Sequence, residues 1–121
     1  MALDRNNSDI AYLLGRALAV IERAEQVLNR GRKGIVERQI EVAGTGIGRF
    51  YGLLYGRFVR GFTPRLHQEL AEIMDKVPSE AFPQRLSLEQ FTTLQTGFYH
   101  QRKALSLAKE ETADLGASMQ F

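Results

Sequence analysis

The chain of 121 residues contains no cysteine, and it has only three prolines and two histidines. The absence of cysteine excludes disulfides, thiolate metal sites and cysteine nucleophiles, and it agrees with a reducing cytoplasm. The histidines, His67 and His100, have no second histidine or glutamate at the spacing of a helical metal site. We therefore expect no metal, no cofactor and no catalytic activity.

Long apolar runs and strand-like patterns are absent as well. No segment approaches the ~18 apolar residues of a membrane span, and the start of the chain is largely polar, so no signal peptide is visible. We expect a cytoplasmic protein that does not contact a membrane. An apolar fraction of 44% is typical of a globular protein. Without alternating apolar and polar runs, this composition favours an all-α domain.

Apolar residues recur three and four positions apart along most of the chain, which is typical of amphipathic helices in a bundle. We predict a single all-α domain over residues 1–121, a bundle of about five helices. Residues 1–7 are expected to form a flexible lead, and residues 112–121 a mobile tail. The predicted helices cover residues 9–29, 35–43, 48–62, 64–77 and 88–111.

Three of these helices begin at residues that typically cap a helix N-terminus. Ser8 is the expected cap of the first helix, with Asp9 in the first turn to complement the helix dipole. Thr63-Pro64 places a cap and a first-turn proline before the fourth helix. Ser87 with Gln90 predicts a capping box before the fifth.

The predicted fourth helix is acidic on the side away from its apolar residues. This side carries Glu69, Glu72 and Asp75, which we interpret as a solvated face. Phe82 lies in the connection that follows, and we expect it to pack into the core.

The predicted third helix has three distinct faces when its residues are placed about 100° apart. Its apolar face consists of Phe50, Tyr51, Leu54, Tyr55, Phe58 and Phe62. Roughly opposite lie Arg49, Arg57 and Arg60, and a stripe between the two faces consists of Gly48, Gly52 and Gly56. Because a glycine inside a helix costs ~1 kcal/mol relative to alanine, a compensating contact is expected. Close packing of another helix is the interpretation that we favour over close approach of a partner's backbone.

Basic charge is concentrated in residues 1–65, which hold 11 basic and 6 acidic residues, and no acidic residue occurs from 42 to 68. An exposed arginine often has a carboxylate three or four positions away. The following arginines have none: Arg16, Arg23, Arg30, Arg49, Arg57 and Arg60. A row of uncompensated arginines attracts polyanions, although carboxylates of other helices, such as Glu37 or Glu41, are alternative partners. The candidate nucleic-acid-binding residues are Arg16, Arg23, Arg30, Arg32, Lys33, Arg49, Arg57, Arg60, Arg65 and Arg102.

Two motifs, near the two ends of the chain, carry a resemblance to a known family. The first is Tyr12-Leu13-Leu14-Gly15-Arg16, followed by Ile21-Glu22. The second is Gly97-Phe98-Tyr99-His100-Gln101-Arg102, preceded by Phe82-Pro83 and by Leu86-Ser87. In this order, over residues 9–108, the chain resembles the C-terminal region of the large subunit of type I-C CRISPR interference complexes.

In such systems the C-terminal region is also made as a separate small subunit, so the resemblance implies a non-catalytic helical subunit of the Cascade complex. The implied partners are guide RNA and target DNA, the Cascade backbone and large subunits, and further copies of the same chain. Its basic face would support the guide–target hybrid and the displaced non-target strand, while base pairing reads the sequence. The alternative is a purely structural helical adaptor whose arginines pair with acidic protein surfaces. A free-standing helical DNA-binding regulator is a weaker alternative, because no helix-turn-helix spacing is evident.

Overall fold

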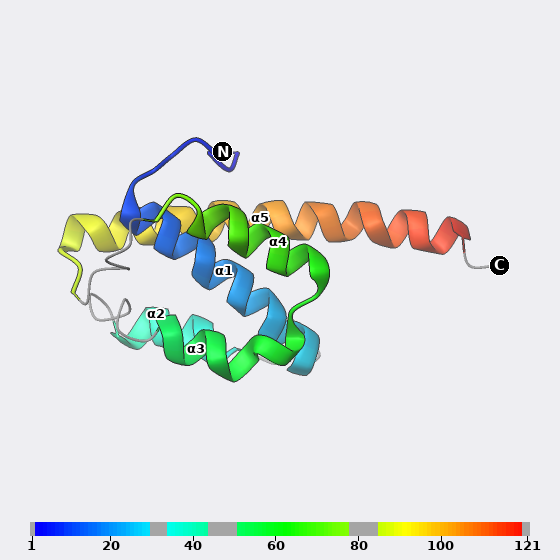
Figure 1. Ribbon diagram of the computed structural model, residues 1–121, viewed down its shortest axis with the longest axis horizontal. Coiled ribbons are helices and arrows are strands. Elements are labelled where there is room, and N and C mark those ends of the chain that lie inside the picture. Colours follow the sequence, from blue (N-terminus) through cyan, green and yellow to red (C-terminus); the bar gives the residue numbers. More distant parts are fainter. Residues whose placement is uncertain (1, 30–33, 44–50, 78–84, 120–121) are drawn as a thin grey trace.

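The computed structural model describes residues 2–29, 34–43, 51–77 and 85–119, and within these ranges the fold is all-α, as predicted (Figure 1). The helices are α1 (Ile10–Asn29), α2 (Ile35–Ala43), α3 (Tyr51–Phe58), α4 (Pro64–Met74) and α5 (Leu88–Met119). A short 3-10 helix, η2 (Val59–Gly61), joins α3 to α4. None of the helices in the described part of the chain combines the length and the apolar character of a membrane span.

Helix α1 lies at the centre of the bundle and packs against all the other elements, most extensively against α5. In Figure 1, α1 crosses in front of α5 near its N-terminus and then runs diagonally between α4 on one side and the α2–α3 pair on the other. Every residue of α1 from 11 to 22 is buried, polar ones included. A helix that is enclosed in this way has no solvent-facing side along this stretch. This enclosure determines where the charged residues of α1 lie.

The α1–α5 crossing depends on a glycine from each helix. A Cβ atom on Gly15 would lie 2.0 Å from the backbone oxygen of Leu94, and one on Gly97 would lie 2.3 Å from that of Tyr12. The two backbones therefore touch where each helix lacks a side chain. Since the obstructing atoms belong to backbone, no rotamer change can make room for a methyl group.

We expect Gly15→Ala to lower the free energy of unfolding by about 1–3 kcal/mol, because α1 and α5 must move apart. Gly56→Ala is the matched control, since a Cβ there would meet no atom within 4 Å. That change should raise the free energy of unfolding by up to ~1 kcal/mol, the helix-propensity difference between the two residues. Urea unfolding of both variants measures the contrast, and equal destabilisation would contradict the close-contact explanation.

The N-termini of the helices confirm two predicted caps and correct one. The side chain of Thr63 accepts a hydrogen bond from the Leu66 amide of α4, and Ser87 and Gln90 form the reciprocal capping box of α5. At α1 the cap is Asp9 rather than Ser8, because the Asp9 carboxylate accepts the amide of Ala11 at 2.9 Å. A carboxylate at this position both satisfies free amides and complements the helix dipole.

A buried glutamate of α1 serves as the cap of α2. The carboxylate of Glu25 accepts hydrogen bonds from the backbone amides of Ile35 and Val36. Gly34 allows this approach, since a Cβ there would lie 2.4 Å from Glu25 Oε1. Although Glu25 is only 1% exposed, its charge is therefore compensated by the N-terminus of the short helix.

Helix α3 is shorter than predicted, and its face assignment is confirmed where its side chains are described. Leu54 and Phe58 are buried, while Tyr55 and Phe62 are half-buried and pack edge to face. The helix ends at Phe58 and continues as η2, which brings Gly61 against the Ala24 carbonyl of α1. The surroundings of Gly56 are open, so close packing does not explain that member of the glycine stripe.

The ends of the chain differ from the predicted boundaries. Helix α5 continues to Met119 instead of ending near residue 111, and Figure 1 shows its C-terminal part extending beyond the other helices. The leading segment, expected to be flexible, makes specific contacts through Asp4 and Arg5. The predicted packing of Phe82, the positions of Gly48 and Phe50, and the surroundings of Tyr51 and Gly52 lie outside what the structure describes.

Candidate nucleic-acid interface

Three of the predicted arginines are exposed on consecutive elements. Arg57 lies at the end of α3, Arg60 in η2 and Arg65 in the first turn of α4. All three are exposed, and no ion pair holds any of them within the described residues. The Arg57 guanidinium lies 5.9 Å from the ring centroid of the buried Phe58. We call these three exposed cations, which follow one another along the chain and are unpaired within the described residues, the α3–α4 arginine surface.

Arg16 does not belong to that surface, because it is buried and not exposed as the sequence analysis expected. Its side chain is 0% exposed, and its Nε donates a 2.8 Å hydrogen bond to Oε1 of Gln101 on α5. The physical reason is that α4 and α5 cover the polar side of α1 as well as its apolar side. A guanidinium enclosed by three helices cannot reach a phosphate in this conformation.

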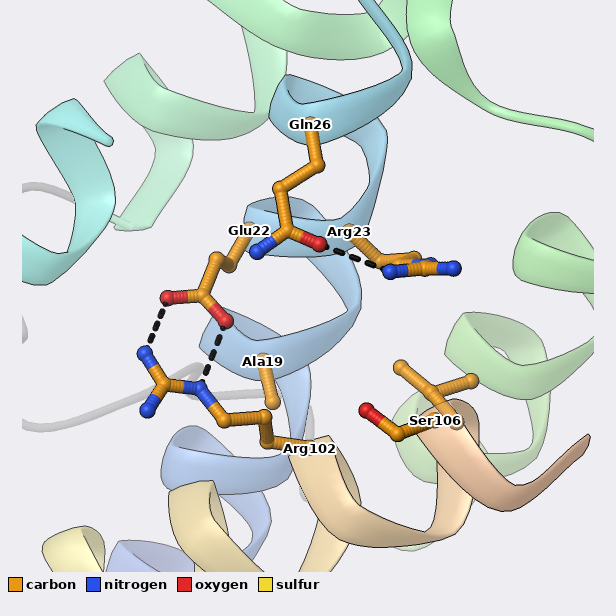
Figure 2. A pocket seen from close by; sticks show the side chains of 7 residues that line it. Ala19, Glu22, Arg23, Gln26, Arg102 and Ser106 are labelled. Carbon is orange, nitrogen blue, oxygen red and sulfur yellow. Dashed lines mark hydrogen bonds and ion pairs between the residues drawn. The ribbon is translucent and has the colours of Figure 1, made fainter. Parts of the chain in front are cut away.

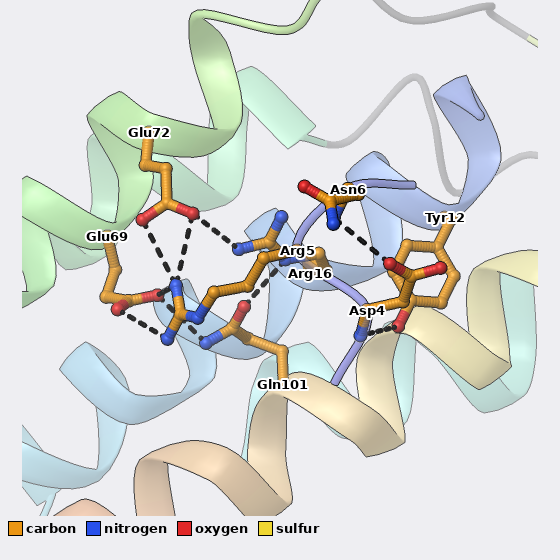
Figure 3. A network of polar contacts seen from close by, with 8 residues as sticks. All are labelled: Asp4, Arg5, Asn6, Tyr12, Arg16, Glu69, Glu72 and Gln101. Carbon is orange, nitrogen blue, oxygen red and sulfur yellow. Dashed lines mark hydrogen bonds and ion pairs between the residues drawn. The ribbon is translucent and has the colours of Figure 1, made fainter. Parts of the chain in front are cut away.

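A polar network surrounds Arg16 in the interior of the bundle (Figure 3). Its Nη2 lies 3.7 Å from Glu72, an ion pair too long for a hydrogen bond. Arg5 closes the network from outside, with hydrogen bonds of 3.1 Å to both Glu69 and Glu72. Gln101 joins it by donating to Glu69 at 3.2 Å. Glu69 and Glu72, which the sequence analysis assigned to a solvated face, therefore bind two arginines and an amide, whereas Asp75 is exposed as expected.

The titration behaviour of the two arginines reflects their surroundings. Desolvation lowers the pKa of Arg16 from its ordinary value, and the neighbouring carboxylate of Glu72 opposes this shift. The hydrogen bond to Glu69 raises the pKa of Arg5. Both guanidinium groups remain charged at neutral pH, because arginine loses its proton only in strongly basic solution. The network is thus a group of permanent cations and carboxylates that compensate one another.

The leading segment is attached to α5 through the same region. The Asp4 amide donates to the Tyr12 hydroxyl at 3.0 Å, and this hydroxyl lies 2.9 Å from Nδ1 of His100. The two rings meet edge to face with centroids 5.8 Å apart. Tyr12 and His100, both members of the motifs quoted above, therefore hold the lead against the α1–α5 pair.

Arg102 is also paired within the chain. Its Nε and Nη2 donate to the two carboxylate oxygens of Glu22 at 2.9 and 2.7 Å, and Nη2 lies 3.4 Å from Glu37. The hydrogen bond to Glu22 raises the pKa of Arg102. Its guanidinium also packs 4.9 Å from the ring centroid of Phe98. Of the predicted basic residues, Arg16 and Arg102 therefore have structural partners on other helices, the alternative that the sequence left open.

Arg23 is neither fully exposed, like the α3–α4 arginine surface, nor paired with a carboxylate, like Arg102. It is half-buried and lies beside a cavity of about 170 Å³ (Figure 2). Its Nη1 donates to Gln26 at 2.8 Å, and no carboxylate pairs with it within the described residues. The cavity lies between α1 and α5, and Arg102 and Ser106 line its α5 side. No described carboxylate therefore compensates the charge of Arg23, which lines this cavity.

The remaining candidates, Arg30, Arg32, Lys33 and Arg49, lie outside the described residues. The structure also shows two exposed residues of α5 that the sequence analysis did not select, Tyr99 and Lys103. Lys103 has no carboxylate three or four positions away, so the rule that selected the arginines could have found it. Among the described residues, no group of three histidines or acids could hold a metal ion.

A comparison with known protein families identifies the family to which the chain belongs. The model of the CRISPR-associated protein family Cas_Csd1 matches residues 1–106. No curated protein matches the chain at a significant level. The match includes the central helix, the α3–α4 arginine surface and α5 up to the cavity. The chain therefore belongs to the Cas_Csd1 family of CRISPR-associated proteins.

Proposed function

We propose that the chain is a non-catalytic small subunit of a type I-C CRISPR RNA-guided surveillance complex in the cytoplasm. It binds the nucleic-acid backbone, both the guide–target hybrid and the displaced non-target strand, and it contacts the Cascade backbone and large subunits and further copies of itself. Membership of the Cas_Csd1 family and the resemblance to the C-terminal region of a type I-C large subunit support this assignment. The observation that carries it is the α3–α4 arginine surface, whose three cations have no carboxylate partner in the described residues.

The geometry of this surface suits phosphate better than bases. Arginine side chains bind phosphate oxygens through two parallel N–H groups, and such contacts hold a nucleic acid without reading its sequence. A subunit of an RNA-guided complex needs only this kind of contact, because pairing with the guide reads the sequence. The 27 residues from 42 to 68 contain no acid that could repel the phosphates.

The proposal that the chain is non-catalytic rests on the contacts that its two histidines make. The Nδ1 atom of His100 contacts the Tyr12 hydroxyl, and the exposed ring of His67 packs 4.9 Å from that of Phe62. Neither histidine has a described carboxylate as a partner, and the Tyr12 hydroxyl beside His100 belongs to a side chain that is only 3% exposed. Incubation of the pure chain with single-stranded DNA and divalent cations should yield no cleavage. Cleavage that His100→Ala abolishes would contradict this part of the proposal.

The alternative function is that of a structural adaptor, and the arginines that bind carboxylates within the chain support this alternative. Arg5, Arg16 and Arg102 all bind carboxylates within the chain, so arginine is used here for protein contacts. If Arg57, Arg60 and Arg65 met acidic patches of neighbouring subunits in the same way, their loss would prevent assembly. The two functions therefore predict different results when these three arginines are lost. A structural adaptor would fail to assemble into the complex, whereas a nucleic-acid-binding subunit would assemble and bind nucleic acid less tightly.

We expect the triple variant Arg57→Ala, Arg60→Ala, Arg65→Ala to weaken target binding by the assembled complex while assembly itself proceeds. Each lost phosphate contact should reduce the slope of log K against log salt by about 0.7 on a single strand, and about 2 in total. The weakening should be the same for unrelated sequences. The matched control replaces the same three arginines with lysine, which keeps the charge and most of the slope. Failure to assemble, with unchanged affinity in the residual complex, would favour the adaptor.

A further inference from the structure

The face of α5 that points away from the core carries an exposed aromatic ring beside an unpaired cation. Tyr99 is 56% exposed, and its hydroxyl has no hydrogen-bond partner within the described residues. Lys103 follows four positions later, on the same side of the helix, and is exposed without an ion pair there. An aromatic ring next to a free cation is a combination that single-stranded nucleic acids recognise.

The ring of Tyr99 is held in place on one side and open on the other. The ring of Phe98 packs against it edge to face at 5.6 Å, with an interplanar angle of 76°. The guanidinium of Arg102 lies 5.7 Å from its centroid and is itself fixed by the two hydrogen bonds to Glu22. Because the surroundings already restrict the ring, a planar group stacking on its open side would lose little additional side-chain entropy.

The cavity beside Arg23 continues this face. Arg102 and Ser106, three and seven positions after Tyr99, line it from α5, and Arg23 and Gln26 line it from α1 (Figure 2). Its volume of about 170 Å³ would hold roughly five waters in the bulk liquid. The cavity is therefore large enough for a small polar group that enters from solvent.

The charges around the cavity favour an anion. The carboxylate of Glu22 is neutralised by its paired hydrogen bonds to Arg102, and Glu37, which also pairs with Arg102, is not part of the lining. Among the described residues, Arg23 has only the neutral Gln26 as a partner, so no described carboxylate compensates its charge beside the cavity. A phosphate oxygen would complete the hydrogen bonding of this guanidinium.

We propose that Tyr99, Lys103 and the Arg23 cavity form a subsite for one unpaired nucleotide of a single-stranded nucleic acid. The base stacks on the open side of Tyr99, and the adjoining phosphates contact Lys103 and Arg23. Only an unstacked base can use an aromatic platform, so a duplex is not a ligand of this subsite. The inference rests on the proposed function and adds a second surface, on α1 and α5, that selects single strands.

The absence of tryptophan from the chain allows a direct test. Tyr99→Trp would introduce a single fluorophore at the platform, and titration with a fluorescently labelled oligothymidylate should quench it as the oligonucleotide binds. A blunt duplex of the same length should bind without quenching. Leu88→Trp is the matched control, because Leu88 is 76% exposed on the same helix. It lies 11 residues earlier, about 16 Å away along the helix axis, and should not be quenched.

Affinities measured by anisotropy of the labelled strand complete the test. Tyr99→Ala should weaken single-strand binding about 5- to 150-fold, the range that corresponds to loss of one base–aromatic stack. Tyr99→Phe should bind like the parent, since the ring is retained. Arg23→Gln and Lys103→Gln should each reduce the salt slope by about 0.7. Circular dichroism confirms that each variant is folded.

The possible results separate the subsite from the proposed function. Saturable binding of the single strand without quenching of Tyr99→Trp, or with unchanged affinity of Tyr99→Ala, would overturn the subsite. The α3–α4 arginine surface would then remain the binding surface, and the proposed function would stand. Absence of binding of any nucleic acid, by the chain and by the assembled complex, would overturn both.

Discussion

Replacing Phe58 by alanine is expected to lower the free energy of unfolding by about 3–5 kcal/mol, the range for loss of a large buried aromatic. Phe58 is 4% exposed and belongs to the core that α1, α3, α4 and α5 share. Its neighbours along the chain provide no substitute, since Arg57 and Val59 are exposed. The cavity left by the ring would lie where the short helix α3 is attached to the bundle.

The matched control for this change is Leu53→Ala, on the same helix. Leu53 is 72% exposed, so its truncation should change the free energy of unfolding by no more than about 0.5 kcal/mol. Urea unfolding followed by circular dichroism compares the two variants. Similar midpoints for Phe58→Ala and Leu53→Ala would show that α3 does not contribute Phe58 to the core. Because α3 carries Arg57, the Phe58 variant should also bind nucleic acid less well near its unfolding midpoint.

The helical architecture was predictable because it depends on local patterns. The spacing of apolar residues located the five α-helices of the described residues. Thr63 caps α4, and Ser87 with Gln90 caps α5, as predicted. One of the boundaries that failed involves a tertiary contact. Helix α3 ends early where Gly61 meets the Ala24 carbonyl, a contact between residues 37 positions apart in the sequence. Local spacing cannot indicate such a contact.

The candidate site was harder to predict, because the partners of its arginines are distant in sequence. The search for carboxylates three or four positions away could not find Glu22 for Arg102, which lies 80 positions earlier. It also could not show that α4 and α5 cover the polar side of α1. One signal was present in the sequence: Gln101 is a polar residue on the apolar side of α5. A buried amide requires a hydrogen-bond partner, and in the structure that partner is Arg16.

Arg16 therefore has a structural role, and we expect Arg16→Ala to lower the free energy of unfolding by about 3–5 kcal/mol. This is the range for truncating a large, fully buried side chain to alanine. The change would leave a cavity among α1, α4 and α5, and Oε1 of the 0% exposed Gln101 would lose its donor. Glu69 and Glu72 would retain Arg5, so the remaining carboxylates would still have one cation.

A double-mutant cycle separates the hydrogen bond from the lost volume. Arg16→Met keeps most of the side-chain volume but removes the donor, so it should still destabilise the chain through the unpaired amide of Gln101, by about 1–3 kcal/mol. Combining it with Gln101→Leu removes both polar groups, and the double variant should be more stable than the sum of the single effects by about 0.5–3 kcal/mol. Strictly additive effects would show that the Arg16–Gln101 bond contributes nothing. The same variants should keep the salt slope of nucleic-acid binding, because a guanidinium that is enclosed by three helices makes no phosphate contact.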